Sequence, residues 1–173
     1  MIGLEGRTLK SQRLTYRLLD EADKGALHEI LSDKSVTEPA GFMPAETEAG
    51  FDEFFDGLTR YDTGIAILRD GALIGYIHVN KYVPELPEYN GKKCVSTGFV
   101  IGKEYQNQGY ASETLGTVTL YLKQSFDFCF ADHFEGNEPS RRVIEKCGYR
   151  YFDRYTMFFD GLGKEMTCLS YVY

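Results

Sequence analysis

Apolar residues recur at helical spacing in several separate stretches of this chain. Residues 26–31 carry apolar positions that would share one helix face, and residues 51–58 place four apolar residues at i, i+3, i+4 and i+7. Residues 115–122 keep the same spacing, which is typical of a helix with one buried face. Pro139 suits the first turn of a fourth helix and Gly148 its C-terminal end. The pattern therefore predicts four helices.

Shorter apolar runs of strand length lie between these helices. The runs are residues 13–19, 65–68, 73–77, 95–101 and 128–131, with two more strands expected within residues 149–173. Asp70-Gly71 separates two of the runs, which is a strong signal for a β-hairpin. A closing hairpin is expected to turn at residues 160–163. The sum predicts a mixed α/β domain of seven strands and four helices.

Length and charge narrow the class of protein. The 173 residues are enough for one domain with its own core, so we expect residues 1–173 to form a single domain. Hydrophobic residues at 43% and charged residues at 26% are an ordinary globular mixture. The formal net charge of −7 would repel a phosphate backbone, so nucleic-acid binding is not expected. A negative surface suits a cationic substrate such as an amine.

The cysteines and the chain start bear on metal binding and location. The four cysteines are scattered, with neither a CxxC pair nor a histidine at ligand spacing, so no metal site is expected. Residues 1–10 lack a basic stretch followed by an apolar one, and no apolar run approaches the roughly 20 residues of a membrane span. These features favour a cytoplasmic protein with reduced thiols and no membrane partner.

The stretch with the most chemical information is a strand, a glycine-containing loop and a helix around residues 95–122. A helix N-terminus carries free N–H groups and a partial positive charge. Gly109 and Ala111 keep side chains small there, so N–H groups from Gln108 to Ser112 can surround a pyrophosphate. A strand–glycine–helix junction is also common without any ligand. The glycine spacing fits neither a dinucleotide-binding nor a Walker motif, which disfavours a flavin or nicotinamide enzyme.

Two motifs in order resemble those of the GNAT N-acetyltransferase superfamily. Gln106–Ala111 fits Q/R-x-x-G-x-G/A, and Asn137–Tyr149 resembles N-x-x-S-x-x-x-x-E-K-x-G-F/Y. Ser11–Arg17 and Ser32–Thr37 look like the opening of the branch that includes ribosomal-protein N-terminal acetyltransferases. The resemblance extends from about residue 9 to the end of the chain.

The resemblance implies a fold and a reaction. The fold is a mixed, mostly antiparallel sheet of about six to seven strands, flanked by about four helices and splayed at the strand that binds acyl-CoA. The reaction is transfer of an acetyl group from acetyl-CoA to a primary amine by direct attack, and the acceptor is a protein N-terminus, a small amine or an amino sugar. The implied cofactor-binding residues are Phe99, Val100, Ile101, Gln106, Asn107, Gln108, Gly109, Tyr110, Ala111, Ser112, Asn137 and Ser140.

The resemblance also implies candidates for catalysis. Ser140 matches a serine near the thioester sulfur, where its hydroxyl can assist the leaving thiolate. Other family members use a tyrosine, for which Tyr155 or Tyr149 can stand in. The structural alternatives are a first-turn serine bound to local backbone for Ser140, and core or strand aromatics for the tyrosines.

The general base and the assembly state stay open. Glu38, His78 and Glu104 are candidate bases, although a solvated charge or an outward strand residue is the favoured interpretation of each. A different class of function, a sensor that binds acyl-CoA without turnover, needs the same loop. The chain is expected to be a monomer or a homodimer.

Overall fold

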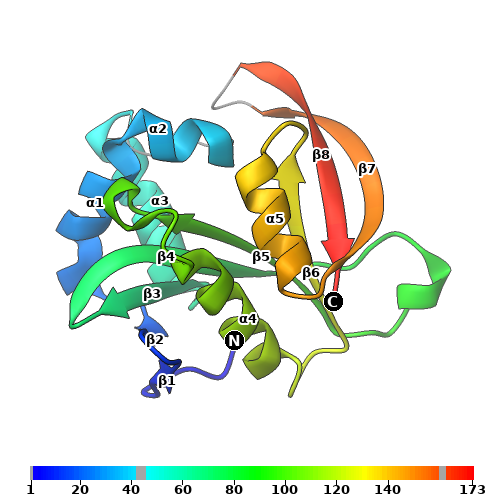
Figure 1. Ribbon diagram of the computed structural model, residues 1–173, viewed down its shortest axis with the longest axis horizontal. Helices are drawn as coiled ribbons and strands as arrows, with labels where there is room; N and C mark the ends of the chain where they lie inside the picture. The colour runs from blue at the N-terminus through cyan, green and yellow to red at the C-terminus, as the bar shows by residue number, and fades with distance from the viewer. Residues whose placement is uncertain (1, 42–45, 160–162) are drawn as a thin grey trace.

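Eight strands form one sheet in the order β1-β2-β3-β4-β5-β6-β8-β7, with helices on both of its faces (Figure 1). This computed structural model describes residues 2–41, 46–159 and 163–173. The strands are β1 (Leu9–Lys10), β2 (Thr15–Leu18), β3 (Gly64–Arg69), β4 (Ala72–Lys81), β5 (Cys94–Ile101), β6 (Phe128–Phe134), β7 (Arg150–Phe159) and β8 (Lys164–Val172). The α-helices are α1 (Lys24–Ser32), α2 (Lys34–Thr37), α3 (Glu48–Arg60), α4 (Tyr110–Leu122) and α5 (Glu138–Lys146). Short 3₁₀ turns are Glu21–Asp23, Glu38–Ala40, Pro87–Tyr89 and Lys103–Tyr105.

The predicted mixed α/β fold is confirmed, with more elements than expected. The sheet has eight strands where six to seven were expected, and the described residues form five α-helices where four were expected. The additional elements are β1, which has two residues, and α2, which has a single turn. Neither is long enough to show a period in the pattern of apolar residues. Of the expected turn at residues 160–163, residues 160–162 lie outside the described part.

The first hairpin follows from its turn residues. Asp70 and Gly71 both have positive φ, at 51° and 85°, so they form the two-residue turn that the right-handed twist of paired strands favours. β3 and β4 pair antiparallel on either side of this turn. The Asp-Gly prediction is confirmed.

Each face of the sheet is covered by its own helices. Tyr76 on β4 and Val100 on β5 are paired across the strands, and both pack in a cluster with Leu27 of α1 and Phe55 of α3. The neighbouring Ile77 points to the opposite face, where α4 and α5 complete a second cluster. We call these the α1/α3 face and the α4/α5 face. Successive side chains of a strand alternate between the faces, so strand register assigns each residue to one of them.

The sheet divides between β5 and β6. These two strands are parallel and pair only from Cys94–Thr97 to Phe128–Ala131. Beyond this point Gly98–Ile101 of β5 pairs only with β4, whereas Asp132–Phe134 of β6 stays paired with β8. The splay expected beside the strand at residues 95–101 is therefore confirmed, and it leaves strand edges without a strand partner on both sides of the gap.

Candidate functional site

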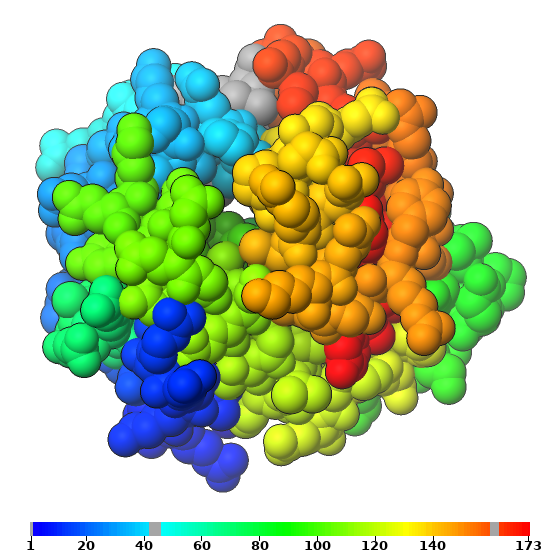
Figure 2. All heavy atoms as spheres, viewed as in Figure 1, coloured from blue at the N-terminus to red at the C-terminus, as the bar shows by residue number. Residues whose placement is uncertain are grey.

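A cavity of about 710 Å³ lies where β5 and β6 part. Figure 2 shows its opening as a hollow between the green segment at the start of α4 and the yellow-orange α5. Its lining includes Phe99 and Ser112 from the α4/α5 side and His78 and Asp132 from the α1/α3 side. Since both faces contribute, the cavity runs through the sheet at the gap.

The loop before α4 presents main-chain N–H groups to this cavity. Asn107 and Gly109 have positive φ, at 59° and 82°, and the helical ladder begins with Glu113, whose N–H donates to the Gly109 carbonyl at 3.0 Å. Within the described residues, the N–H groups of residues 107–112 have no hydrogen-bond acceptor. Free N–H groups at a helix N-terminus, with the positive end of the helix dipole behind them, favour a bound anion such as a diphosphate.

The predicted cofactor-binding residues come together at this cavity, with one exception. Every one of them except Gln108 lines it. The Gln108 side chain instead donates to the Glu104 carbonyl at 2.8 Å, away from the cavity. The Gln106 side chain donates to the Ile101 carbonyl at 2.9 Å, which ties the loop to the end of β5.

Asn137 and Ser140 lie at the start of α5, across the cavity from the loop. The Asn137 Oδ1 accepts from the Ser140 main-chain N–H at 3.2 Å and so caps the helix. Its Nδ2 donates to the Pro39 carbonyl at 2.8 Å, which connects α5 to the turn after α2. Ser140 lines the cavity, and its hydroxyl has no hydrogen-bond partner within the described part of the chain. The local backbone contact considered from sequence is made by its N–H, and the hydroxyl is left available.

Asp132 is a carboxylate of the cavity that sequence reasoning missed. It lies on β6 just beyond the last residue paired to β5, and among the described residues that line the cavity it is the sole acidic one. The Tyr155 hydroxyl donates to Asp132 Oδ2 at 3.3 Å. Loss of hydration raises the pKa of Asp132, although hydrogen bonds from Ser170 and Tyr155 oppose this shift.

Tyr155 lies on β7, where strand register places it on the same face of the sheet as Asp132, and like Ser140 of α5 it lines the cavity. Burial and the nearby charge of Asp132 raise the pKa of Tyr155, which keeps the phenol protonated. Tyr149, the other predicted tyrosine, is buried in the core, where its hydroxyl lies 2.7 Å from the hydroxyl of Thr119. The residues that line the cavity do not include Tyr149.

The three base candidates separate into one cavity residue and two surface residues. His78 lines the cavity, and burial lowers its pKa to about 4, so its imidazole is neutral at pH 7. Its ring occupies the space beside Gly98 on the paired strand, where an added Cβ would lie 2.4 Å from His78 Cε1. Glu38 and Glu104 are exposed and do not line the cavity.

The remaining predictions concern the cysteines, metal binding, a membrane span and the loop at residues 38–44. The four cysteines are free thiols. Within residues 2–41, 46–159 and 163–173, no cluster of three or more His, Cys, Asp or Glu side chains is arranged to hold a metal, and no helix is long and apolar enough to cross a membrane. Of the loop at residues 38–44, considered as a wall for the acceptor, Pro39 and Ala40 line the cavity and residues 42–44 lie outside the described part.

Comparison with known proteins gives consistent matches over most of the chain. A model of the acetyltransferase (GNAT) domain matches residues 13–150. An uncharacterized N-acetyltransferase of Bacillus subtilis (strain 168), YnaD, is 28% identical over 146 residues, which cover 82% of each protein. The crystal structure of a GNAT-family acetyltransferase from Bacillus anthracis superposes with a TM-score of 0.80 at 24% identity, covering 96% of this chain and 97% of that one. Mycobacterium smegmatis RimJ, solved in complex with CoA-disulfide, has a TM-score of 0.78 at 15% identity, covering 96% and 86%.

Proposed function

This chain belongs to the GNAT family of acetyltransferases and is therefore an N-acetyltransferase, and on that premise we propose that it transfers the acetyl group of acetyl-CoA to a primary amine by direct attack. One observation carries the proposal. A single cavity connects free N–H groups on the α4/α5 side of the sheet with a carboxylate on the α1/α3 side, through the gap between β5 and β6. Donor and acceptor can thus meet from opposite faces, with residues 1–173 acting as one catalytic domain.

The donor half of the site is the α4/α5 side. We assign the diphosphate of acetyl-CoA to the N–H groups of residues 107–112, which have no acceptor within the described chain. The pantetheine arm is then placed along Gly98–Ile101, whose edge toward β6 carries no strand, and it would add to the sheet by main-chain hydrogen bonds. A main-chain N–H of β5 is assigned to the thioester oxygen, where negative charge develops during attack.

The acceptor half is the α1/α3 side, with Asp132 as its charged group. An aliphatic ammonium must lose a proton before it can attack, and its unperturbed pKa lies at about 8 to 10.4. Asp132 attracts the ammonium and accepts this proton, and its raised pKa makes it a stronger base than an ordinary aspartate. The amine nitrogen then bonds to the acetyl carbon as the carbon–sulfur bond breaks. The second proton that this nitrogen loses neutralises the departing thiolate, so the products are the amide and the free thiol of CoA.

Ser140 and Tyr155 take different roles in this arrangement. Ser140, whose hydroxyl has no hydrogen-bond partner among the described residues, is assigned to the leaving thiolate, to which it can donate a hydrogen bond. Tyr155 donates to Asp132 and is assigned to hold that carboxylate toward the acceptor. The raised pKa of Tyr155 supports a role as a hydrogen-bond donor rather than as a source of protons. Holding both substrates in the cavity supplies a further part of the rate.

The test is release of free CoA thiol from acetyl-CoA in the presence of peptides, polyamines, aminoglycosides and simple monoamines. Asp132→Asn keeps the size of the side chain and removes the base, so kcat/KM for the accepted amine should fall by about 10²-fold or more. Asp153→Asn is the matched control, because Asp153 is an exposed aspartate on β7 that does not line the cavity. Thiol release by Asp132→Asn at the parental rate would reject the base assignment. CoA binding without thiol release for every amine would favour the sensor alternative.

A further inference from the structure

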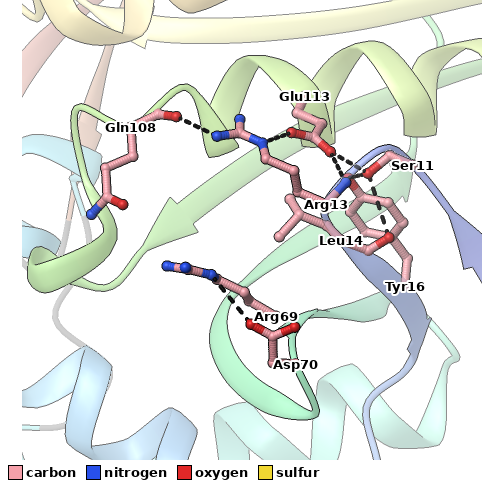
Figure 3. A network of polar contacts seen from close by, with 8 residues as sticks. All are labelled: Ser11, Arg13, Leu14, Tyr16, Arg69, Asp70, Gln108 and Glu113. Carbon is pink, nitrogen blue, oxygen red and sulfur yellow. Dashed lines mark hydrogen bonds and ion pairs between the residues drawn. The ribbon is translucent and has the colours of Figure 1, made fainter.

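Arg13, in the segment before β2, is hydrogen-bonded to the loop before α4, whose N–H groups we assign to the diphosphate (Figure 3). The Arg13 guanidinium donates from Nη1 to the Gln108 carbonyl at 3.0 Å and lies over the ring of Tyr110, 4.4 Å from its centroid. The same guanidinium donates from Nε to Glu113 Oε2 at 2.7 Å, and the Arg13 main-chain N–H donates to Glu113 Oε1 at 2.7 Å. One arginine therefore contacts the loop, the first residue of α4 and the first turn of that helix.

Glu113 is built to hold this arginine in place. Its side chain is 13% exposed, and the Ser11 hydroxyl donates to its Oε1 at 2.7 Å. Burial by itself raises the pKa of Glu113, but the hydrogen bonds from Ser11 and Arg13 outweigh it and lower the pKa below its usual range. The carboxylate thus stays charged near neutral pH. A charged acceptor with three donors is a rigid anchor for the guanidinium.

The contact with the Gln108 carbonyl determines where the next N–H points. The peptide between Gln108 and Gly109 is planar and trans, so its C=O and its N–H point in opposite directions. Arg13 holds the carbonyl, and Arg13 does not line the cavity, whereas Gly109 does. The N–H of Gly109 accordingly points away from Arg13. If this peptide rotated by half a turn, a carbonyl oxygen would take the place of the N–H and would repel a phosphate.

We propose that Arg13 is a positioning residue for the diphosphate of acetyl-CoA: it holds the Gln108–Gly109 peptide with its carbonyl outside the cavity and its N–H inside. This inference rests on the proposed function, because it assumes that the diphosphate binds residues 107–112. It gives a physical role to the opening segment Ser11–Arg17, which the reaction itself does not use. Arg13 acts through the loop and touches no reacting atom.

Two substitutions of Arg13 distinguish orientation of the peptide from a simple attraction between the arginine and the phosphates. Lysine at position 13 would keep the positive charge but lacks the planar fork that reaches Glu113 and Gln108 together. If Arg13 orients the peptide, Arg13→Lys and Arg13→Met should weaken acetyl-CoA binding to a similar extent. If long-range attraction were the cause, Arg13→Lys would retain most of the affinity.

The experiment compares two ligands and three variants by calorimetry, with NMR titration for the weaker ligand. Acetyl-CoA carries the diphosphate, and S-acetylpantetheine lacks it and depends on β5 alone. Arg13→Met and Arg13→Lys should each weaken acetyl-CoA about tenfold and leave S-acetylpantetheine unchanged, because one charge-assisted hydrogen bond on the loop is lost. The KM for acetyl-CoA should rise with kcat unchanged. Arg69→Met is the matched control, since Arg69 lies 5.4 Å from the same Tyr110 ring and forms its ion pair with Asp70.

Each outcome bears on the inference. Equal loss for both ligands would show a general effect on the fold and would overturn it, as would parental acetyl-CoA affinity in Arg13→Met. A loss of acetyl-CoA affinity in Arg69→Met as large as that in Arg13→Met would also overturn it, because any positive charge near Tyr110 would then explain the result. Parental binding of S-acetylpantetheine reports that a variant has folded. If the parent protein itself fails to bind acetyl-CoA, the proposed function is refuted first, and the role of Arg13 with it.

Discussion

Replacement of Gly109 by valine tests whether the main-chain conformation of the loop binds the diphosphate. Gly109 has a φ of +82°, in the left-handed region. A residue with a Cβ pays about 1–2 kcal/mol to stay there. An added Cβ would lie 3.4 Å from Arg13 Nη2, which is an ordinary contact, so backbone strain rather than a clash is the main cost. The strain is relieved if the φ of residue 109 turns negative. This rotation turns the N–H groups of the loop away from the position that we assign to the diphosphate.

We therefore expect Gly109→Val to weaken CoA binding by the same 1–2 kcal/mol, or roughly 5- to 30-fold, measured by isothermal calorimetry. Gly91→Val is the control. Gly91 has a φ of +75° with no heavy atom within 4 Å of an added Cβ, and it does not line the cavity. Only Gly109→Val should lose CoA affinity, whereas Gly91→Val should bind CoA as the parent does. Equal CoA affinities for the two variants would refute the assignment of the diphosphate to this loop.

Three further outcomes follow from the geometry of the cavity. Ser140→Ala should lower kcat more than it raises the Kd for CoA, since the hydroxyl is assigned to the leaving thiolate; equal kcat values for variant and parent would remove it from the reaction. Gly98→Ala should displace the His78 ring, because the new Cβ would lie 2.4 Å from Cε1 of that ring. This variant should raise the KM for the amine more than the KM for acetyl-CoA, and unchanged KM values would place His78 outside the acceptor site. Asp132→Asn should raise the Tm at pH 7 while lowering kcat. The raised pKa of Asp132 means that the folded protein disfavours its carboxylate. The ionised Asp132 therefore lowers the free energy of unfolding at pH values above the folded pKa, and this destabilisation disappears as the pH falls below the ordinary value of about 3.9. A Tm difference that grows toward acid pH would contradict this sign.

The residues that we assign to the acyl-CoA donor were largely predictable because most of them are neighbours in the sequence. Gly109 and the residues around it form one strand–loop–helix unit, and the helix N-terminus supplies N–H groups whatever the rest of the fold does. Asn137 and Ser140 were named together by the resemblance to the GNAT family, and they are the N-cap and the third residue of one helix.

The residues that we assign to the acceptor were not predictable in the same way. The apolar run at residues 128–131 predicted a strand that ended before Asp132, whereas β6 continues to Phe134. Asp132 faces the cavity, and as a polar residue it interrupts the apolar pattern at the point where the strand reaches that cavity. Tyr155 was named only by resemblance, and its partner Asp132 lies 23 residues away on another strand. Candidates chosen by residue type alone, Glu38 and Glu104, lie on the exposed surface.

The sequence by itself determined the class of fold, most of the helices and strands, and the loop whose N–H groups suit an anion, because these depend on short-range periodicity and on glycine at a position with positive φ. The tertiary structure decided which residues share the cavity. That depends on where β5 and β6 cease to pair, on the register that directs Asp132 and Tyr155 to one face, and on the contact of Arg13 with a carbonyl 95 residues away. Strand register and long-range contacts are properties of the whole packed sheet, so no local pattern carries them.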